Sequence, residues 1–173
     1  MKEKAVFLDR DGVLNEERGD YVWRLQDFKI VPGIIDVLQE LKAMGYLLIV
    51  VTNQAGIAKG RYTRKHMQEC HDYFQEESGH LIDHFYFAPD HPDFSESLMR
   101  KPDSLMWERA MAKFNIDPLN SWMVGDKERD LIPAKKFGMK TIRVFLEGFC
   151  EEGEETIGDY GVKEVPEIMS IIV

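Results

Sequence analysis

The sequence predicts a three-layer α/β fold in which a mainly parallel sheet is covered by helices on both faces. Between residues 5 and 145, short apolar runs of strand length alternate with longer segments whose apolar residues recur at helical spacing. Glycine, proline or threonine stands at several segment boundaries, where the chain has to turn. This alternation is typical of parallel sheets, because parallel neighbours need a crossover that a helix supplies.

The elements follow one another in the order βαβαβαβαβ. Strands are expected at residues 5–8, 46–51, 84–88, 121–124 and 140–145, and helices at residues 34–44, 63–77, 104–114 and 128–137. Pro32-Gly33 precedes the first helix, Gly45 and Gly138 follow the first and the fourth, and Thr63 is a suitable N-cap for the second. The acidic, glycine-containing residues 147–160 are predicted to form a loop, and the apolar residues 165–172 a closing helix.

The composition indicates one soluble domain that spans residues 1–173, with a hydrophobic content of 44%. With 22 Lys and Arg against 31 Asp and Glu, the formal net charge is −9 and no basic run is present, so no nucleic-acid partner is expected. No apolar run reaches roughly 18 residues, the N-terminal residues lack a secretory pattern, and Cys70 and Cys150 form no Cys-x-x-Cys pair. We therefore expect a cytoplasmic protein without a membrane anchor or a disulfide, and a monomer as the default state.

Chemically active side chains follow four of the five predicted strands. The first strand is followed by Asp9 and Asp11, the second by Thr52-Asn53-Gln54, the third by a loop that ends in Arg100-Lys101, and the fourth by Gly125-Asp126. Each group alone is commonly a turn or a solvated charge. The two aspartates do not match a calcium loop, because Val13 and Leu14 stand where that loop needs a ligand and a glycine. The joint occurrence of all four groups after successive strands favours one shared site, because ligands collect at the carboxyl ends of parallel strands.

This set of carboxylates, hydroxyl and lysine suits phosphoryl transfer. A carboxylate nucleophile that approaches an anionic phosphate needs cations to offset the repulsion, and Lys101 together with Mg²⁺ shared by Asp9 and Asp126 can supply them. The Thr52 hydroxyl and the backbone N–H of Asn53 can donate to phosphate oxygens. Sharing one ion requires the first and fourth strands to be neighbours, which predicts the Rossmann-like strand order 3-2-1-4-5.

Four motifs, FLDRDG, VVTNQAGIAKG, RKP and MVGDKERD, resemble those of the haloacid dehalogenase superfamily over residues 5 to about 145. The stretches TNQAGIAKGRYT and VGDKERD are similar to those of its D-glycero-D-manno-heptose 1,7-bisphosphate phosphatases, with the histidinol-phosphate phosphatases as close relatives. The resemblance implies that Asp9 attacks phosphorus to form an aspartyl-phosphate, and that Asp11 acts as general acid and then as general base. It also implies Mg²⁺ held by the Asp9 carboxylate, the Asp11 backbone carbonyl and Asp126, with Asp130 in a supporting role. The predicted catalytic residues are thus Asp9, Asp11, Thr52 and Lys101.

Two features that many relatives carry are missing from this sequence. The segments after the first and second motifs leave no room for a cap domain, so an open site walled by loops is expected. The structural zinc site usual in the third loop of the heptose phosphatases would fall on Ala88, Asp90, Ser97 and Met99, which cannot form the tetrahedral site that zinc prefers. We therefore predict Mg²⁺ as the metal and no structural zinc.

The expected substrate is a small phosphorylated sugar, and the resemblance favours a heptose 1,7-bisphosphate that loses its 7-phosphate. The expected substrate-binding residues are Thr52, Asn53, Gln54, Arg100 and Lys101, with Arg18, Lys59 and Arg61 as further candidates around the mouth. Histidinol phosphate is the nearest alternative substrate. A polynucleotide 3′-phosphatase conflicts with the net charge of −9, and a non-catalytic phosphate-binding module conflicts with the presence of every acid that turnover needs.

Overall fold

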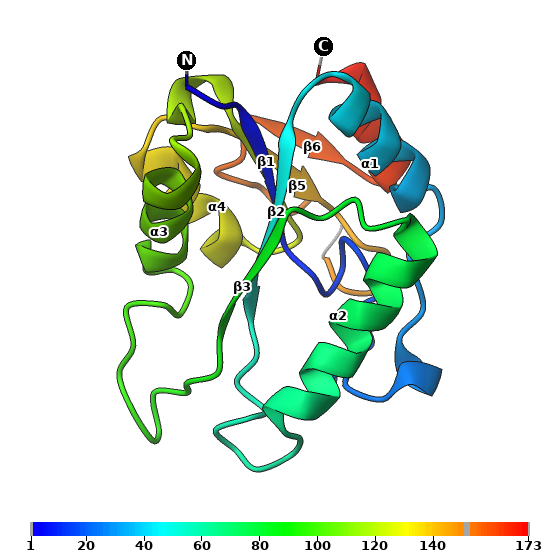
Figure 1. Ribbon diagram of the computed structural model, residues 1–173, viewed down its shortest axis with the longest axis vertical. Coiled ribbons are helices and arrows are strands. Elements are labelled where there is room, and N and C mark those ends of the chain that lie inside the picture. Colours follow the sequence, from blue (N-terminus) through cyan, green and yellow to red (C-terminus); the bar gives the residue numbers. More distant parts are fainter. Residues whose placement is uncertain (1, 151–152, 173) are drawn as a thin grey trace.

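A six-stranded parallel sheet runs through the centre of the molecule (Figure 1). The computed structural model describes residues 2–150 and 153–172. The strands lie in the order β3-β2-β1-β4-β5-β6, and every neighbouring pair is parallel. The predicted order of the first five strands is therefore confirmed, and a sixth strand, which was not predicted, extends the sheet beyond β5.

The elements lie close to their predicted positions. The strands are β1 (Ala5–Leu8), β2 (Leu47–Asn53), β3 (His84–Ala88), β4 (Trp122–Gly125), β5 (Lys140–Val144) and β6 (Tyr160–Val162). The helices are α1 (Ile34–Ala43), α2 (Arg64–Ser78), α3 (Leu105–Phe114) and α4 (Glu128–Lys136), with short 3₁₀ helices η1 (Leu25–Asp27), η2 (Pro118–Asn120) and η3 (Val165–Ser170). β2 runs further than predicted, so Thr52 and Asn53 are its last residues rather than the start of a loop. Within the described ranges, no helix combines the length and apolar character that a membrane crossing requires.

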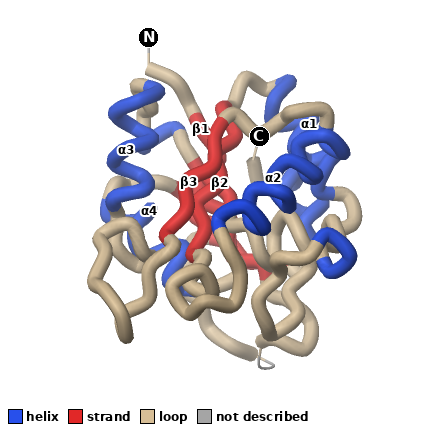
Figure 2. Tube along the Cα trace, turned by 60° about the horizontal axis from the view of Figure 1, so that its bottom comes forward, coloured by secondary structure: helices blue, strands red, loops and turns tan. Residues whose placement is uncertain are grey.

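Helices cover both faces of the sheet, as Figure 2 shows. Successive residues of a strand point to opposite faces, so Val6 and Leu8 of β1 pack in the core with α1, α2 and η3, whereas Ala5 and Phe7 pack in the core with α3 and α4. All four residues are fully buried, which explains why β1 is apolar at every position. Full burial of one Leu or Phe side chain contributes roughly 1.5–3 kcal/mol, so the two cores together fix the sheet between its helices. The predicted three-layer architecture is confirmed.

Local sequence determines both ends of the longest helix. The Thr63 hydroxyl accepts a hydrogen bond from the backbone N–H of His66 at 3.3 Å and thereby caps the first turn of α2. Gly79 ends the helix in the left-handed conformation, with φ of 74°, which glycine adopts at little cost because it lacks a Cβ atom. The N-cap predicted at Thr63 is confirmed.

The C-terminal part of the chain differs from its prediction. The predicted loop at residues 147–160 ends one residue inside β6, and residues 151–152 of that loop lie outside the described residues. Three residues are too few to show a strand period in the sequence, and the segment is a strand because it pairs with β5. The predicted helix at residues 165–172 is instead the shorter 3₁₀ helix η3, whose Val165 and Ile168 are buried in the core beside α1.

Candidate active site

Three neighbouring strands deliver polar side chains to the same edge of the sheet. β1 pairs with β2 on one side and with β4 on the other, so Asp9, Thr52 and Asp126 emerge next to one another where these strands end. The loop after β3 brings Lys101 into the same group. The arrangement follows from the strand order, because the carboxyl ends of parallel neighbours lie on the same side.

Lys101 is the centre of a buried network of ion pairs. Its Nζ lies 2.7 Å from Asp9 Oδ1 and 2.7 Å from Asp130 Oδ1, and it donates to the backbone carbonyl of Val51 at 2.9 Å. The side chains of Lys101, Asp9 and Asp130 are at most 7% exposed. Burial lowers the pKa of a lysine, but the two carboxylates outweigh burial and raise the pKa of Lys101 above its ordinary value. The ammonium group therefore stays charged inside the protein.

Asp9, Asp126 and Asp130 form a cluster of three carboxylates. One oxygen from each lies within 4.8 Å of the others, and no other such group of His, Cys, Asp or Glu ligands occurs in residues 2–150 and 153–172. Burial and the neighbouring carboxylates raise the pKa of Asp9 to about 8 and that of Asp126 to about 6. A divalent cation with a preference for oxygen ligands relieves this kind of repulsion. The structure thus brings Asp9 and Asp126 together and adds Asp130 to them.

Two glycines allow the chain to pack closely around these acids. A Cβ atom at Gly125 would lie 2.4 Å from Asp130 Cβ, and one at Gly12 would lie 2.9 Å from the carboxyl carbon of Asp126. Gly12 also has φ of 87°, a conformation that other residues rarely adopt. The glycines that adjoin Asp11 and Asp126 in the sequence are therefore required by the packing of the site.

Asp11 has a different set of partners. Arg10 Nη2 donates to Asp11 Oδ1 at 2.7 Å, Asn15 Nδ2 donates to the same oxygen at 3.0 Å, and Gln54 Nε2 donates to Oδ2 at 3.3 Å. Burial acts to raise the pKa of Asp11, but the Arg10 charge and the hydrogen bonds from Arg10 and Asn15 lower it below its ordinary value. Neither Arg10 nor Asn15 is among the predicted site residues, although the position of Arg10 between two aspartates is a signal in the sequence.

Gln54 links Thr52 to Asp11. Besides its bond to Asp11, Gln54 Nε2 donates to Thr52 Oγ1 at 2.9 Å, while Gln54 Oε1 accepts from the Tyr62 hydroxyl at 2.6 Å. Gln54 and Thr52 are each 1% exposed. The amide of Gln54 is thus engaged with protein groups, and it orients the Thr52 hydroxyl and the Asp11 carboxylate. Tyr62, which was not predicted to belong to the site, fixes the amide in turn.

Asn53 holds the loop that carries Lys101. Asn53 Oδ1 accepts from the backbone N–H of Lys101 at 3.0 Å, and Asn53 Nδ2 donates to the Lys101 carbonyl at 3.2 Å. The side chain therefore pairs with the loop backbone as a neighbouring strand would. This pair of bonds sets the position at which Lys101 turns toward Asp9.

The rest of the loop is stabilised by hydrogen bonds at the positions where zinc ligands would fall. The Asp90 carbonyl accepts from Arg100 Nη1 at 3.3 Å, and Ser97 Oγ accepts from the Met99 backbone N–H at 3.3 Å. Met99 Sδ accepts from Arg109 Nη1 at 3.7 Å. These contacts order the loop through the protein's own groups.

A cavity of about 460 Å³ opens beside Asp11 and Asn53. Residues of the loop after β1 and of the start of α4 contribute to its walls, among them Glu17, Tyr21 and Arg129. Arg100 and Lys101 line another cavity of about 570 Å³. Among the other predicted candidates, Arg18 forms an ion pair with Asp27, and Lys59 and Arg61 are exposed. Tyr21 and Arg129 are missing from the prediction, because only the fold brings their segments to the site.

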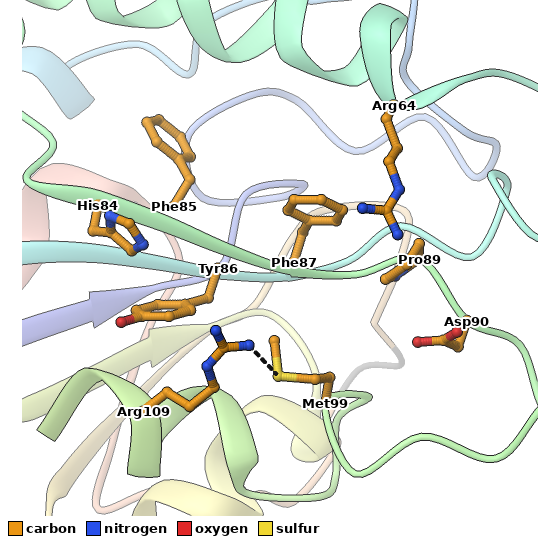
Figure 3. A pocket seen from close by; sticks show the side chains of 9 residues that line it. All are labelled: Arg64, His84, Phe85, Tyr86, Phe87, Pro89, Asp90, Met99 and Arg109. Carbon is orange, nitrogen blue, oxygen red and sulfur yellow. Dashed lines mark hydrogen bonds between the residues drawn. The ribbon is translucent and has the colours of Figure 1, made fainter. Parts of the chain in front are cut away.

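A separate cavity of about 440 Å³ lies over β3, the first strand of the sheet order (Figure 3). Arg64 from α2 and Arg109 from α3 reach it from opposite sides of the strand. The described residues that line it include none of the predicted catalytic, substrate-binding or metal-binding residues. The chemistry predicted from the sequence is therefore gathered at the ends of β1, β2 and β4 and not in this cavity.

The chain is similar to known proteins along most of its length. A family model described as haloacid dehalogenase-like hydrolase matches residues 13–144. The D-glycero-beta-D-manno-heptose-1,7-bisphosphate 7-phosphatase of Haemophilus ducreyi is 40% identical over 150 residues, which cover 82% of this chain and 82% of that protein. The D-glycero-alpha-D-manno-heptose-1,7-bisphosphate 7-phosphatase of Burkholderia mallei is 40% identical over 150 residues, which cover 82% of this chain and 79% of that protein.

A solved structure shares the fold. The crystal structure of D,D-heptose 1,7-bisphosphate phosphatase from B. bronchiseptica, complexed with magnesium and phosphate, matches with a TM-score of 0.86 and 22% sequence identity. The match covers 98% of this chain and 97% of that one, so the same architecture extends over both proteins. On the family model and the sequence relatives together, the chain belongs to the haloacid dehalogenase-like hydrolases.

Proposed function

We propose that the protein is a Mg²⁺-dependent phosphomonoesterase that removes the 7-phosphate from D-glycero-D-manno-heptose 1,7-bisphosphate. The observation that carries this proposal is the buried Lys101, whose Nζ lies 2.7 Å from both Asp9 and Asp130, beside a third acid, Asp126. A nucleophilic carboxylate next to a fixed cation suits an anionic phosphate ester. The choice of substrate is supported by the activities for which the relatives at 40% identity are named.

In the proposed reaction, a carboxylate oxygen of Asp9 attacks the phosphorus atom of the 7-phosphate, and the bond from phosphorus to the sugar oxygen breaks. The departing sugar oxygen takes a proton from Asp11, and the phosphoryl group remains on Asp9. Asp11 then takes a proton from water, whose oxygen attacks the same phosphorus atom, releases inorganic phosphate and restores Asp9. The lowered pKa of Asp11 keeps it ionised in the free protein, so for the first step Asp11 must exchange its contact with Arg10 for a proton.

Thr52, Asn53 and Lys101 are proposed to hold the reacting phosphate. Lys101 places a positive charge 2.7 Å from Asp9 and offsets the repulsion between the nucleophile and the phosphate. The Thr52 hydroxyl, which Gln54 orients, and the backbone N–H of Asn53 are the proposed donors to phosphate oxygens. Gln54 acts in this proposal through Thr52 and Asp11, and Arg100 contacts the part of the substrate beyond the reacting phosphate.

The cluster of three carboxylates fits Mg²⁺, which prefers oxygen ligands. Asp9 and Asp126 would hold the ion together with the backbone carbonyl of Asp11, with Asp130 beside them. When bound, the ion offsets negative charge on the phosphate oxygens and relieves the repulsion that raises the pKa of Asp9. The heptose phosphatase from B. bronchiseptica was crystallised with magnesium and phosphate.

Selective removal of metals tests this assignment. EDTA should stop phosphate release, and added Mg²⁺ should restore it. A zinc-selective chelator should leave both the rate and the melting temperature unchanged, because Asp90, Ser97 and Met99 offer no thiolate or imidazole ligand. Elemental analysis that finds one zinc per chain would contradict the prediction of no structural zinc.

A phosphate-release assay on the purified protein tests the substrate. The panel consists of heptose 1,7-bisphosphate in both anomeric forms, heptose 7-phosphate, histidinol phosphate and a 3′-phosphorylated oligonucleotide. We expect kcat/KM for one heptose bisphosphate to exceed that for histidinol phosphate by at least about tenfold, because the site has cations beyond the reaction centre. A preference for histidinol phosphate would replace the proposed substrate. Efficient release from the oligonucleotide would contradict the expectation based on the net charge of −9.

A further inference from the structure

Among the residues that the structure describes, Arg129 is a cation without a counterion, and it lies beside the proposed reaction centre. It is exposed in the first turn of α4 and lines the same cavity as Asp11 and Asn53. Its side chain has no hydrogen bond, ion pair or ring contact with any residue in the described ranges 2–150 and 153–172. The acids that line the cavity are engaged elsewhere: Glu17 accepts from the backbone N–H groups of Arg18 and Gly19 and lies 3.8 Å from Lys127, and Asp20 accepts from that of Tyr21.

The buried ion pair at the reaction centre anchors Arg129 and Arg100 together. Arg100 immediately precedes Lys101 in the sequence, and Arg129 immediately precedes Asp130. Because Lys101 Nζ and Asp130 Oδ1 are 2.7 Å apart and buried, the backbone segments that carry the two arginines are fixed relative to each other and to Asp9. Burial and the positive charge of Arg129 both lower the pKa of Arg100. The two guanidinium groups therefore repel each other, although Arg129 lines the cavity beside Asp11 and Arg100 lines the neighbouring one beside Lys101.

Two guanidinium groups that repel each other form a suitable place for a doubly charged anion. Arg100 has one hydrogen bond to a neutral group, from Nη1 to the Asp90 carbonyl at 3.3 Å, which leaves other N–H donors of its guanidinium for a ligand. A phosphate group accepts paired hydrogen bonds from guanidinium and removes the repulsion between the two cations. The reacting phosphate itself belongs at Lys101 and Asp9, so the anion at the rim is a second one.

We propose that Arg129 and Arg100 together bind the phosphate group of the substrate that is not hydrolysed, and that Arg129 thereby selects bisphosphates over monophosphates. This inference rests on the proposed function, because it requires a substrate with two phosphates. Arg129 is a binding residue in this proposal and takes no part in bond breaking.

The test compares Arg129→Gln with the wild type on heptose 1,7-bisphosphate and on heptose 7-phosphate, which lacks the second phosphate. We expect kcat/KM for the bisphosphate to fall about 10- to 100-fold, mainly through KM, and to fall far less for the monophosphate. Arg129→Lys should recover part of the loss, because lysine keeps the charge but not the paired donors. Arg64→Gln is the matched control, since Arg64 is also an exposed arginine in the first turn of a helix but lines the cavity over β3.

A double-mutant cycle with Arg100→Ala sharpens the test. If both arginines bind one phosphate, their effects should not be independent. The fold-loss of kcat/KM in the double variant should then differ from the product of the two single fold-losses by at least about threefold. Equal losses of Arg129→Gln on the two substrates, or an unchanged preference for the bisphosphate, would overturn the role of Arg129 while leaving the phosphatase assignment in place. A wild-type protein that does not hydrolyse heptose bisphosphate would overturn the proposed substrate and this inference together.

Discussion

The reaction centre and the face of β3 hold their basic side chains in different ways. At the reaction centre, Lys101 lies between two carboxylates at 2.7 Å and is almost fully buried. Along β3, three successive aromatic residues each contact a basic side chain by its ring: Phe85 stacks on His71 with ring centroids 4.4 Å apart, Tyr86 lies 5.9 Å from the Arg109 guanidinium, and Phe87 lies 5.4 Å from that of Arg64. Figure 3 shows Arg64 and Arg109 on opposite sides of the strand.

The difference shows what decides the charge of a basic group. Lys101 stays charged although it is buried, because the carboxylates repay the cost of removing an ammonium group from water. His71 is also buried, but its Nε2 has no hydrogen-bond partner, and burial lowers its pKa to about 3. An exposed arginine therefore needs no acidic partner to stay charged, because water already stabilises its charge and an aromatic ring only adds to this. A buried basic group, in contrast, requires an acidic partner to stay charged.

Asp9→Asn should have the largest effect on activity. The amide cannot form an acyl phosphate, so we expect turnover to fall by at least about 10³-fold, measured by phosphate release at saturating Mg²⁺. The fold should remain intact by circular dichroism, because the change removes one of three carboxylates that repel one another. A variant with activity within tenfold of the wild type would remove Asp9 from the role of nucleophile.

Lys101→Met should have the largest effect on stability. It leaves Asp9 and Asp130 buried without the cation between them, so we expect the free energy of unfolding to fall by about 3–5 kcal/mol in urea titrations. The control is Lys65→Met, because Lys65 is 85% exposed and lies 3.9 Å from Glu69, and this change should cost less than about 0.5 kcal/mol. Equal effects of the two substitutions would mean that the buried network does not contribute to stability.

His71→Phe should change how stability depends on pH. The folded-state pKa of His71, about 3, lies below its ordinary value of 6.5, so its contribution to stability is complete above pH 6.5 and is lost as the pH falls toward 3. For the wild type this amounts to a loss on the order of 3 kcal/mol between pH 6.5 and pH 4, which the variant should lack. The difference between the two urea titrations isolates His71 from Asp9, whose raised pKa acts in the opposite direction. Parallel pH profiles would show that the pKa of His71 is not lowered in the folded protein.

Arg64→Gln and Arg109→Gln should have the smallest effects. Each loses a contact between a cation and an aromatic ring at the edge of the sheet, which is worth about 0.5–1 kcal/mol at an exposed site. Phosphate release should stay within twofold of the wild type, because the cavity that these residues line is separate from the reaction centre. A loss of activity beyond tenfold in either variant would show that the two regions are coupled.

The spacing of apolar residues and the glycine, proline and capping residues at segment ends were sufficient to predict the main helices and strands, but not the short ones. β1 and β3 have their predicted bounds, because β1 is an apolar run between Lys4 and Asp9, and β3 is a largely aromatic run between Asp83 and Pro89. β6 escaped prediction because a strand of three residues has no visible period and exists through its pairing with β5. The order of the first five strands could be inferred from the expectation that the acids after the first and fourth strands share one ion.

The candidate site could be predicted to the extent that its residues follow strands directly. Asp9 and Asp126 directly follow β1 and β4, and Thr52 is the next-to-last residue of β2. Arg10 and Tyr62 were missed because they lie in loops, and Arg129, in the first turn of α4, was missed because only tertiary contacts bring it to the site. The ion pair between Asp130 and Lys101 likewise joins residues from two separate segments, and no local sequence pattern predicts it.

The two hydrogen bonds between the Asn53 side chain and the Lys101 backbone have a consequence for how this protein can evolve. They hold the Lys101 backbone from the β2 side, so we expect residues 89–99 to tolerate changes in length and sequence without displacing Lys101. A loop that does not position the lysine can acquire new contacts for a different substrate. Asn53 would thereby allow substrate specificity to diverge while the proposed chemistry at Asp9 stays the same.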